Sequence, residues 1–162
     1  MSYTLEKIEN IADIIHNNTA MQDSTVIDVV EVANKLGFTV YWSDFHDDVS
    51  GMVKSSPEEK SIYVNKSDIP QRQRFTIAHE IGHIVLHHDF GTSEFTQVDY
   101  RNANNSYDHK EWEANAFASA LLMPKDKAIE IWKSIQDVDD FANIFKVSKL
   151  AASIRLQNLG LI

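Results

Sequence analysis

The residues best suited to chemistry in this chain form the run His79-Glu80-Ile81-Gly82-His83. Two histidines four positions apart lie on one face of an α-helix, about one turn from each other. Their imidazoles can therefore converge on one tetrahedral metal ion. Glu80 lies one step round the helix, too offset to bind the metal with them, but able to take a proton from water held there. The pattern predicts a zinc-dependent hydrolase with Glu80 as its catalytic general base.

The same residues also have a purely structural interpretation, in which both histidines are core residues satisfied by hydrogen bonds to protein groups. Apolar side chains occur on almost every face of the surrounding segment, from Phe75 to Leu86. A helix that is apolar on nearly all sides is buried, and buried histidines need polar partners. We favour the metal site, because two histidines and a glutamate seldom fall into this spacing by chance.

A catalytic zinc site needs a third protein ligand and an open fourth position. His87 lies a further helical turn beyond His83 and is expected to point past the metal. Asp89 could bind in principle, but without glycine at position 86 the chain is not expected to turn sharply enough. We expect His87 and His88 to lie near the site or at the surface.

A second helix is a better source of the third ligand. It begins near Glu111 and Glu113, and alanines at 114, 116, 118 and 120 permit close approach of another helix. Glu113 is expected to be half buried, so it needs a cation or a hydrogen-bond donor. We expect Glu113 to bind the metal, on a face with Phe117 and Ala120. Spacing alone leaves Glu111 open, and both could instead be solvated acids that favour the helix dipole.

The elements that must position these residues follow from the pattern of apolar residues, caps and turns. Helices are expected at about 3–17, 24–36, 71–87, 110–123 and 124–134, with two short ones in 139–158. Strands are expected at 38–42, 51–53 and 61–65, the last two as a hairpin, and a loop is expected from 91 to 109. This predicts an α+β fold with a small antiparallel sheet. Residues 1–124 would form the core, and 125–162 a helical C-terminal subdomain packed on it.

Bulk composition limits the possible functions. The chain has 162 residues, no cysteine and a net charge of −9. Any metal must therefore be held by His, Asp or Glu, and strong nucleic-acid binding is not expected. The start of the chain lacks the pattern of a signal peptide, and no run approaches the ~18 apolar residues of a membrane span. We expect a cytoplasmic protein without a membrane partner.

Two segments resemble the ImmA/IrrE family of metallopeptidases: RFTIAHEIGHIVLHH at 74–88 and EWEANAFASALLMP at 111–124. The strand SIYVN and the final VSKLAASIRLQNLGLI are also similar to the family. The resemblance implies a zincin-like core with a helical, helix-turn-helix-like tail, and a Zn2+ site of His79, His83 and Glu113. It also implies a separate protein substrate: family members are often encoded on prophages or mobile elements and cut helix-turn-helix repressors.

We therefore expect a zinc endopeptidase that makes limited cuts in a helix-turn-helix repressor. A zincin cleft takes its substrate as a strand beside the sheet edge, which here is expected to come from the Gly51–Asn65 hairpin. Candidates for stabilising the oxyanion are Tyr107, His109, Arg101 and His46, although each such residue is more often an ordinary surface side chain.

Two other classes of function are open from the sequence. One is a non-cleaving regulatory binding protein on a zincin scaffold, and the intact Glu80 argues against it because pure binding needs no base. The other is a DNA-binding regulator that acts through the tail. The basic residues of the tail are Lys146, Lys149 and Arg155. Three basic residues are few for binding the phosphates of DNA.

Overall fold

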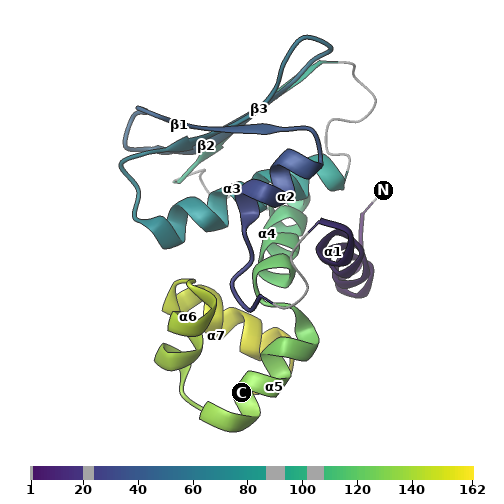
Figure 1. Ribbon diagram of the computed structural model, residues 1–162, viewed down its shortest axis with the longest axis vertical. Helices are drawn as coiled ribbons and strands as arrows, with labels where there is room; N and C mark the ends of the chain where they lie inside the picture. Colours follow the sequence, from purple (N-terminus) through teal and green to yellow (C-terminus); the bar gives the residue numbers. More distant parts are fainter. Residues whose placement is uncertain (1, 20–23, 87–93, 102–107) are drawn as a thin grey trace.

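The computed structural model describes residues 2–19, 24–86, 94–101 and 108–162. Within these ranges the chain forms seven helices and one four-stranded sheet, an α+β fold as expected (Figure 1). The helices are α1 (Leu5–Thr19), α2 (Val29–Lys35), α3 (Pro70–Val85), α4 (His109–Leu122), α5 (Lys125–Ile135), α6 (Val138–Phe145) and α7 (Lys149–Asn158). The strands are β1 (Thr39–Ser43), β2 (Val49–Ser55), β3 (Lys60–Asn65) and β4 (Phe95–Tyr100).

The sheet is mixed, not purely antiparallel as expected. Its order is β1-β3-β2-β4. Strands β2 and β3 form the expected antiparallel hairpin, whereas β1 pairs parallel with β3. This register aligns Val40, Ile62 and Val53 across three strands, and all three are buried. The hairpin therefore places β3 beside β1. The three aligned apolar side chains face the helices beneath the sheet.

Strand β4 occupies part of the segment that was expected to be a loop. It pairs antiparallel with β2, with Met52 opposite Val98. The hairpin strands are consequently internal, and in the described part of the chain the sheet edges are β1 and β4. The expectation that the hairpin supplies the edge is therefore wrong. Gln97 and Asp99 obscured the strand in the sequence, because polar residues occupy positions where a core strand would have apolar ones.

Helix α3 lies beneath the sheet and against α4 (Figure 1). Its residues from Thr76 to His83 are all buried, so every face of this stretch is covered. Two glycines allow the close approach of its neighbours. A Cβ at Gly51 would lie 2.5 Å from Thr76 Cγ2, and one at Gly82 would lie 3.1 Å from Ala114 Cα. Backbone therefore packs directly against α3 on two sides.

The C-terminal helices lie at the end of the molecule opposite the sheet (Figure 1). Arg155 on α7 is 1% exposed. Its guanidinium donates to Met123 O at 2.9 Å and pairs through both terminal nitrogens with the carboxylate of Glu9 on α1. One buried cation thus joins the tail, the end of α4 and the first helix. No helix in the described ranges is long and apolar enough to cross a membrane.

We predict that Arg155→Met lowers the free energy of unfolding by about 3 kcal/mol, because it leaves Glu9 without its cation and Met123 O without a donor. Urea denaturation followed by circular dichroism measures this. The matched control is Lys149→Met, which removes the exposed ion pair with Asp139 and should leave the midpoint unchanged. Equal shifts in the two variants would show that Arg155 does not hold the tail in place.

Candidate metal centre

Three side chains from α3 and α4 point their ligand atoms at one place. His79 Nε2 and His83 Nε2 are 3.1 Å apart. The Glu111 carboxylate bridges them, with Oε2 at 3.1 Å from His79 Nε2 and Oε1 at 3.0 Å from His83 Nε2. All three ligand atoms lie within 4.8 Å of one another. The described residues therefore contain a donor set of two imidazoles and one carboxylate.

Asn115 fixes the orientation of the first imidazole. His79 Nδ1 lies 2.8 Å from Asn115 Oδ1, and because an amide oxygen only accepts, Nδ1 must carry the proton. The lone pair of Nε2 is then directed at the cluster. Glu111 and Asn115 are one helical turn apart, so a single face of α4 supplies both the carboxylate and the group that orients His79.

The spacing of these atoms fits zinc. In a tetrahedral site with bonds of 2.0–2.2 Å, neighbouring ligand atoms are about 3.3 Å apart. The observed separations of 3.0 to 3.1 Å are close to that value. Three protein ligands also leave one position for water or substrate, which distinguishes catalytic from structural zinc sites.

The structure does not place Glu113, the expected third ligand, at the histidines. Residues 111 and 113 are about 200° apart round a helix, so their side chains leave α4 on opposite sides. Glu113 is 2% exposed, accepts a hydrogen bond from Tyr3 N at 2.6 Å and pairs with His109 Nε2 at 2.9 Å. Its burial was expected, but α1 and the first turn of α4 satisfy its charge.

Two features explain why α4 presents Glu111. The Asp108 carboxylate caps the helix by accepting from Lys110 N at 2.9 Å. Gly82 then packs against Ala114 and Phe117, so the expected packing face of Glu113, Phe117 and Ala120 is only partly correct. A signal in the sequence could have favoured Glu111, because Asn115 follows it by four residues and can orient a histidine.

Glu80 is completely buried, and neither of its carboxylate oxygens has a hydrogen-bond partner among the described residues. Burial raises its pKa to about 8, and His79 opposes this rise only in part. A Cβ on Gly51 would lie 3.7 Å from Oε1. An unsatisfied buried carboxylate costs stability, so its presence beside a donor set suggests a partner that arrives with metal or substrate.

The side chains of the cluster strongly shift one another's pKa values. Burial alone would lower the pKa of His79, but the hydrogen bond to Glu111 and the charges of Asp99, Glu80 and Glu111 raise it to about 9. Burial would raise the pKa of Glu111, yet the two histidines hold it well below its ordinary range. Without a metal, His79 and Glu111 therefore share a proton at the place where a cation would bind.

Asp99 is a site residue that the sequence analysis missed. Its Oδ2 lies 3.8 Å from His79 Nε2, and its side chain is 21% exposed. Burial raises its pKa, while the nearby His79 opposes that rise. Strand assignment would have located it, because residues 97 and 99 of a strand share one face. Gln97 on that face reaches Glu111, with Nε2 to Oε1 at 3.4 Å.

The residues considered for the oxyanion have other contacts in the structure. Arg101 pairs with Asp68, and the ring of His109 stacks on Trp112 and pairs with Glu113. The carbonyl of His46 accepts from Val49 N at 3.0 Å. Tyr107, the remaining candidate for the oxyanion, lies outside the described residues. So do Asp89, which was considered as a metal ligand, and His87 and His88, which were expected near the site or at the surface.

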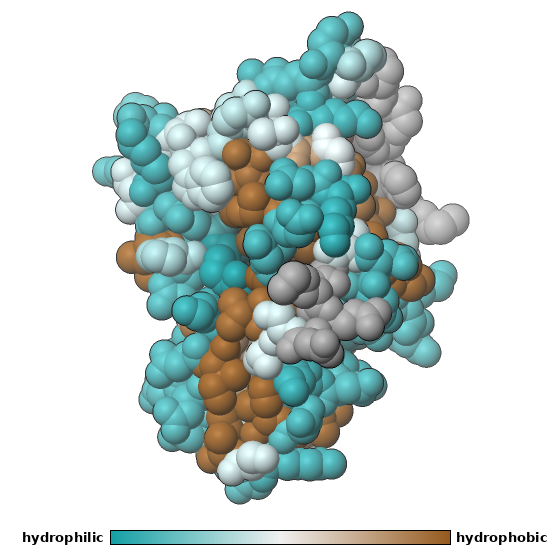
Figure 2. Space-filling model, in the orientation of Figure 1, coloured by the Kyte–Doolittle hydropathy of each residue, from teal (hydrophilic) through white to brown (hydrophobic). Residues whose placement is uncertain are grey.

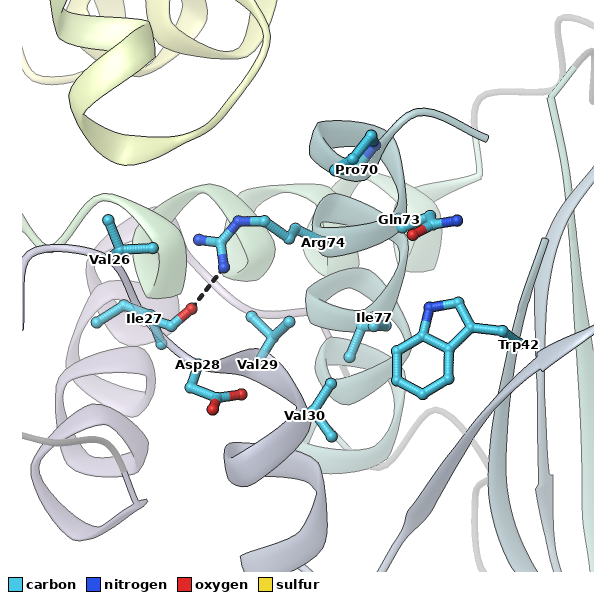
Figure 3. A pocket seen from close by; sticks show the side chains of 10 residues that line it. All are labelled: Val26, Ile27, Asp28, Val29, Val30, Trp42, Pro70, Gln73, Arg74 and Ile77. Carbon is cyan, nitrogen blue, oxygen red and sulfur yellow. Dashed lines mark hydrogen bonds between the residues drawn. The ribbon is translucent and has the colours of Figure 1, made fainter. Parts of the chain in front are cut away.

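A separate hollow of about 350 Å³ lies where α2, the start of α3 and β1 meet (Figure 3). Trp42 and Ile77 form apolar walls, and the guanidinium of Arg74 donates to Ile27 O at 2.6 Å. None of the cluster residues lines it. The hollow is therefore distinct from the metal-ligand cluster.

Residues 33–157 match the family model described as the IrrE N-terminal-like domain. The radiation response metalloprotease IrrE of Deinococcus radiodurans is 33% identical over 81 residues, which cover 46% of this chain and 23% of that protein. An uncharacterized immunity region protein 2 of Bacillus phage phi105 is 32% identical over 114 residues, covering 69% of this chain and 68% of that protein.

A solved structure, titled as a Mycobacterium tuberculosis transcriptional regulator, shares the fold. Its TM-score is 0.69 at 20% identity, covering 93% of this chain and 46% of that one. The match to the Deinococcus protein spans about a quarter of its length, and the match to the regulator about half of that chain. This chain therefore corresponds to only part of the length of each of these two proteins.

We predict that the apparent affinity for zinc rises about tenfold for each pH unit from 6.5 to 8, because zinc must displace the His79 proton. The sign follows from the raised pKa of about 9: below that pH the metal-free site holds a proton, so lower pH weakens binding. Competition with a fluorescent chelator measures the slope. An affinity independent of pH would exclude a protonated histidine from the site.

Proposed function

We propose that this chain, which belongs to the ImmA/IrrE family of metallopeptidases, is a zinc-dependent endopeptidase that makes limited cuts in a helix-turn-helix transcriptional repressor. A cytoplasmic site of action is part of the proposal, because such repressors act there. The observation that carries it is the juxtaposition of the His79, His83 and Glu111 ligand atoms with the unsatisfied, buried carboxylate of Glu80.

In this mechanism His79, His83 and Glu111 would hold the zinc, and Asn115 keeps His79 in the tautomer that leaves Nε2 free to bind it. When bound, zinc would polarise the substrate carbonyl and make water a stronger nucleophile. Glu80 accepts the proton of the attacking water and returns it to the leaving amine.

The substrate would bind as an extended strand beside β4. This strand forms one edge of the described sheet, and its inner face carries the residues that reach His79 and Glu111. Strand addition uses backbone hydrogen bonds, so the target must offer an extended segment. A folded repressor has few such segments. The complete burial of Glu80 further limits which segments can reach the site. Both features support limited cleavage.

The proposal that the substrate is a repressor rests on the family and on the phage relative, whose name places that relative in an immunity region. Features of the C-terminal tail favour binding to a protein rather than to DNA. Lys149 is paired with Asp139 at 2.9 Å, and Arg155 is buried against Glu9. Figure 2 shows an apolar strip over the C-terminal helices, and Leu150 on α7 is 71% exposed. A helix that binds DNA would instead present basic side chains to the phosphates.

We predict that Glu80→Gln keeps the metal and loses peptide cleavage by a factor on the order of 10² or more, because glutamine cannot accept the proton. Elemental analysis and turnover of a fluorogenic peptide measure the two quantities. The contrast is Glu111→Gln, which should lower the metal content as well. Turnover unchanged in Glu80→Gln would remove this residue from the mechanism, whereas no turnover by the zinc-loaded wild type would favour a non-cleaving protein.

We also predict that a helix-turn-helix repressor from the same genome is cut at one or two sites, and only in the absence of chelator. Mass spectrometry of the intact repressor after incubation identifies the products. The Glu80→Gln protein is the control for a contaminating protease. Cuts throughout the repressor would indicate a general peptidase, and no metal-dependent cut would favour the binding role.

A further inference from the structure

We propose that Asp99 is a fourth protein ligand, which closes the metal's remaining coordination position in the resting protein. This inference rests on the metal site of the proposed function and adds a regulatory element to it. It concerns a carboxylate on β4, a different element from the helices that supply the other three ligands.

Asp99 approaches the metal-facing side of the His79 imidazole. His79 Nδ1 is committed to Asn115, so any group that supports the histidine from behind belongs on that side. Asp99 lies instead on the Nε2 side, where His83 and Glu111 also converge. A carboxylate in this position faces the metal, not the back of the ligand.

The distance between Asp99 and His79 is slightly longer than the spacing of two zinc ligands. Asp99 Oδ2 is 3.8 Å from His79 Nε2, whereas neighbouring ligands of a tetrahedral zinc are about 3.3 Å apart. A displacement of roughly half an ångström, small for a side chain, would bring the two atoms to ligand spacing. Carboxylate oxygen is also a normal zinc ligand. Among the described residues only His79, His83 and Glu111 have ligand atoms within 4.8 Å of one another, so Asp99 must move towards the other two ligands as well when metal binds.

The pairing of β4 with β2 places this carboxylate beside the cluster. Asp99 stands opposite Gly51 in the pairing of β4 with β2, so its cross-strand neighbour has no side chain. The same glycine lies beside Glu80. The strand pair therefore holds Asp99 next to the metal-ligand cluster, and the side chain of Thr76 fills the space beside Gly51.

Four protein ligands would leave no position for water, as in structural zinc sites. The resting protein would then be inactive until Asp99 withdraws. Asp99 belongs to the edge strand beside which a substrate would bind, so substrate pairing can displace the strand that carries it. This arrangement would restrain a protease whose cluster otherwise contains everything needed for hydrolysis.

The test replaces zinc with cobalt(II), whose visible absorption reports coordination, in the wild type, Asp99→Asn and a control. The control is Thr96→Ala, an exposed position on the same strand. Removing a direct ligand should lower metal affinity at least about tenfold in Asp99→Asn. Its spectrum should change, and acetohydroxamate should perturb it at concentrations that leave wild type and control unchanged. Far-ultraviolet circular dichroism of the metal-free proteins checks folding.

Equal affinity, spectrum and acetohydroxamate response in wild type and Asp99→Asn would overturn the assignment of Asp99 while leaving the three-ligand site intact. Failure of the site itself gives a different result. In that case the wild type would bind no cobalt, or Glu111→Gln would bind it as tightly as wild type does. Asp99→Ala, which has no oxygen on the side chain, repeats the comparison if the asparagine variant misfolds.

Discussion

At Gly82, helix α3 approaches α4 so closely that an added Cβ would make tighter contacts than side chains ordinarily do. A Cβ at this position would lie 3.1 Å from both Cα and O of Ala114, nearer than side chains normally pack. Gly82 also sits between the two histidines in sequence. The contact that permits close packing is therefore the one that sets the distance from His79 and His83 to Glu111, and a larger residue would separate the ligand helices.

Burial of charge follows from this packing. The histidines, Glu80 and the carboxylates of Asp99 and Glu111 share a space from which water is largely excluded, so their charges interact strongly. The pKa of Glu80 rises because its burial is only partly offset by His79, while that of Glu111 falls because two histidines contact it. A divalent cation would relieve the repulsion among the acids, which is the physical reason to regard the cluster as a metal site.

Much of this could be predicted from local patterns. The helix that carries the histidines, the hairpin and the stop of α4 before Pro124 depend on spacing and on residues that cap or break helices. Glu111 and Glu113 could not be separated in this way, because their difference is a rotation about α4 fixed by Asp108, Gly82 and Tyr3. Strand β4 was missed because Gln97 and Asp99 face the site, so function replaced the apolar residues that mark a strand.

The central claim is that one metal ion is held by His79, His83 and Glu111 beside Glu80. A crystal structure of the zinc-loaded protein, with anomalous data on both sides of the zinc absorption edge, tests it most directly. The account predicts a single strong peak bonded to the Nε2 atoms of both histidines and to the Glu111 carboxylate. A peak bonded to Glu113 in place of Glu111, or no peak at the histidines in a zinc-replete crystal, would contradict it.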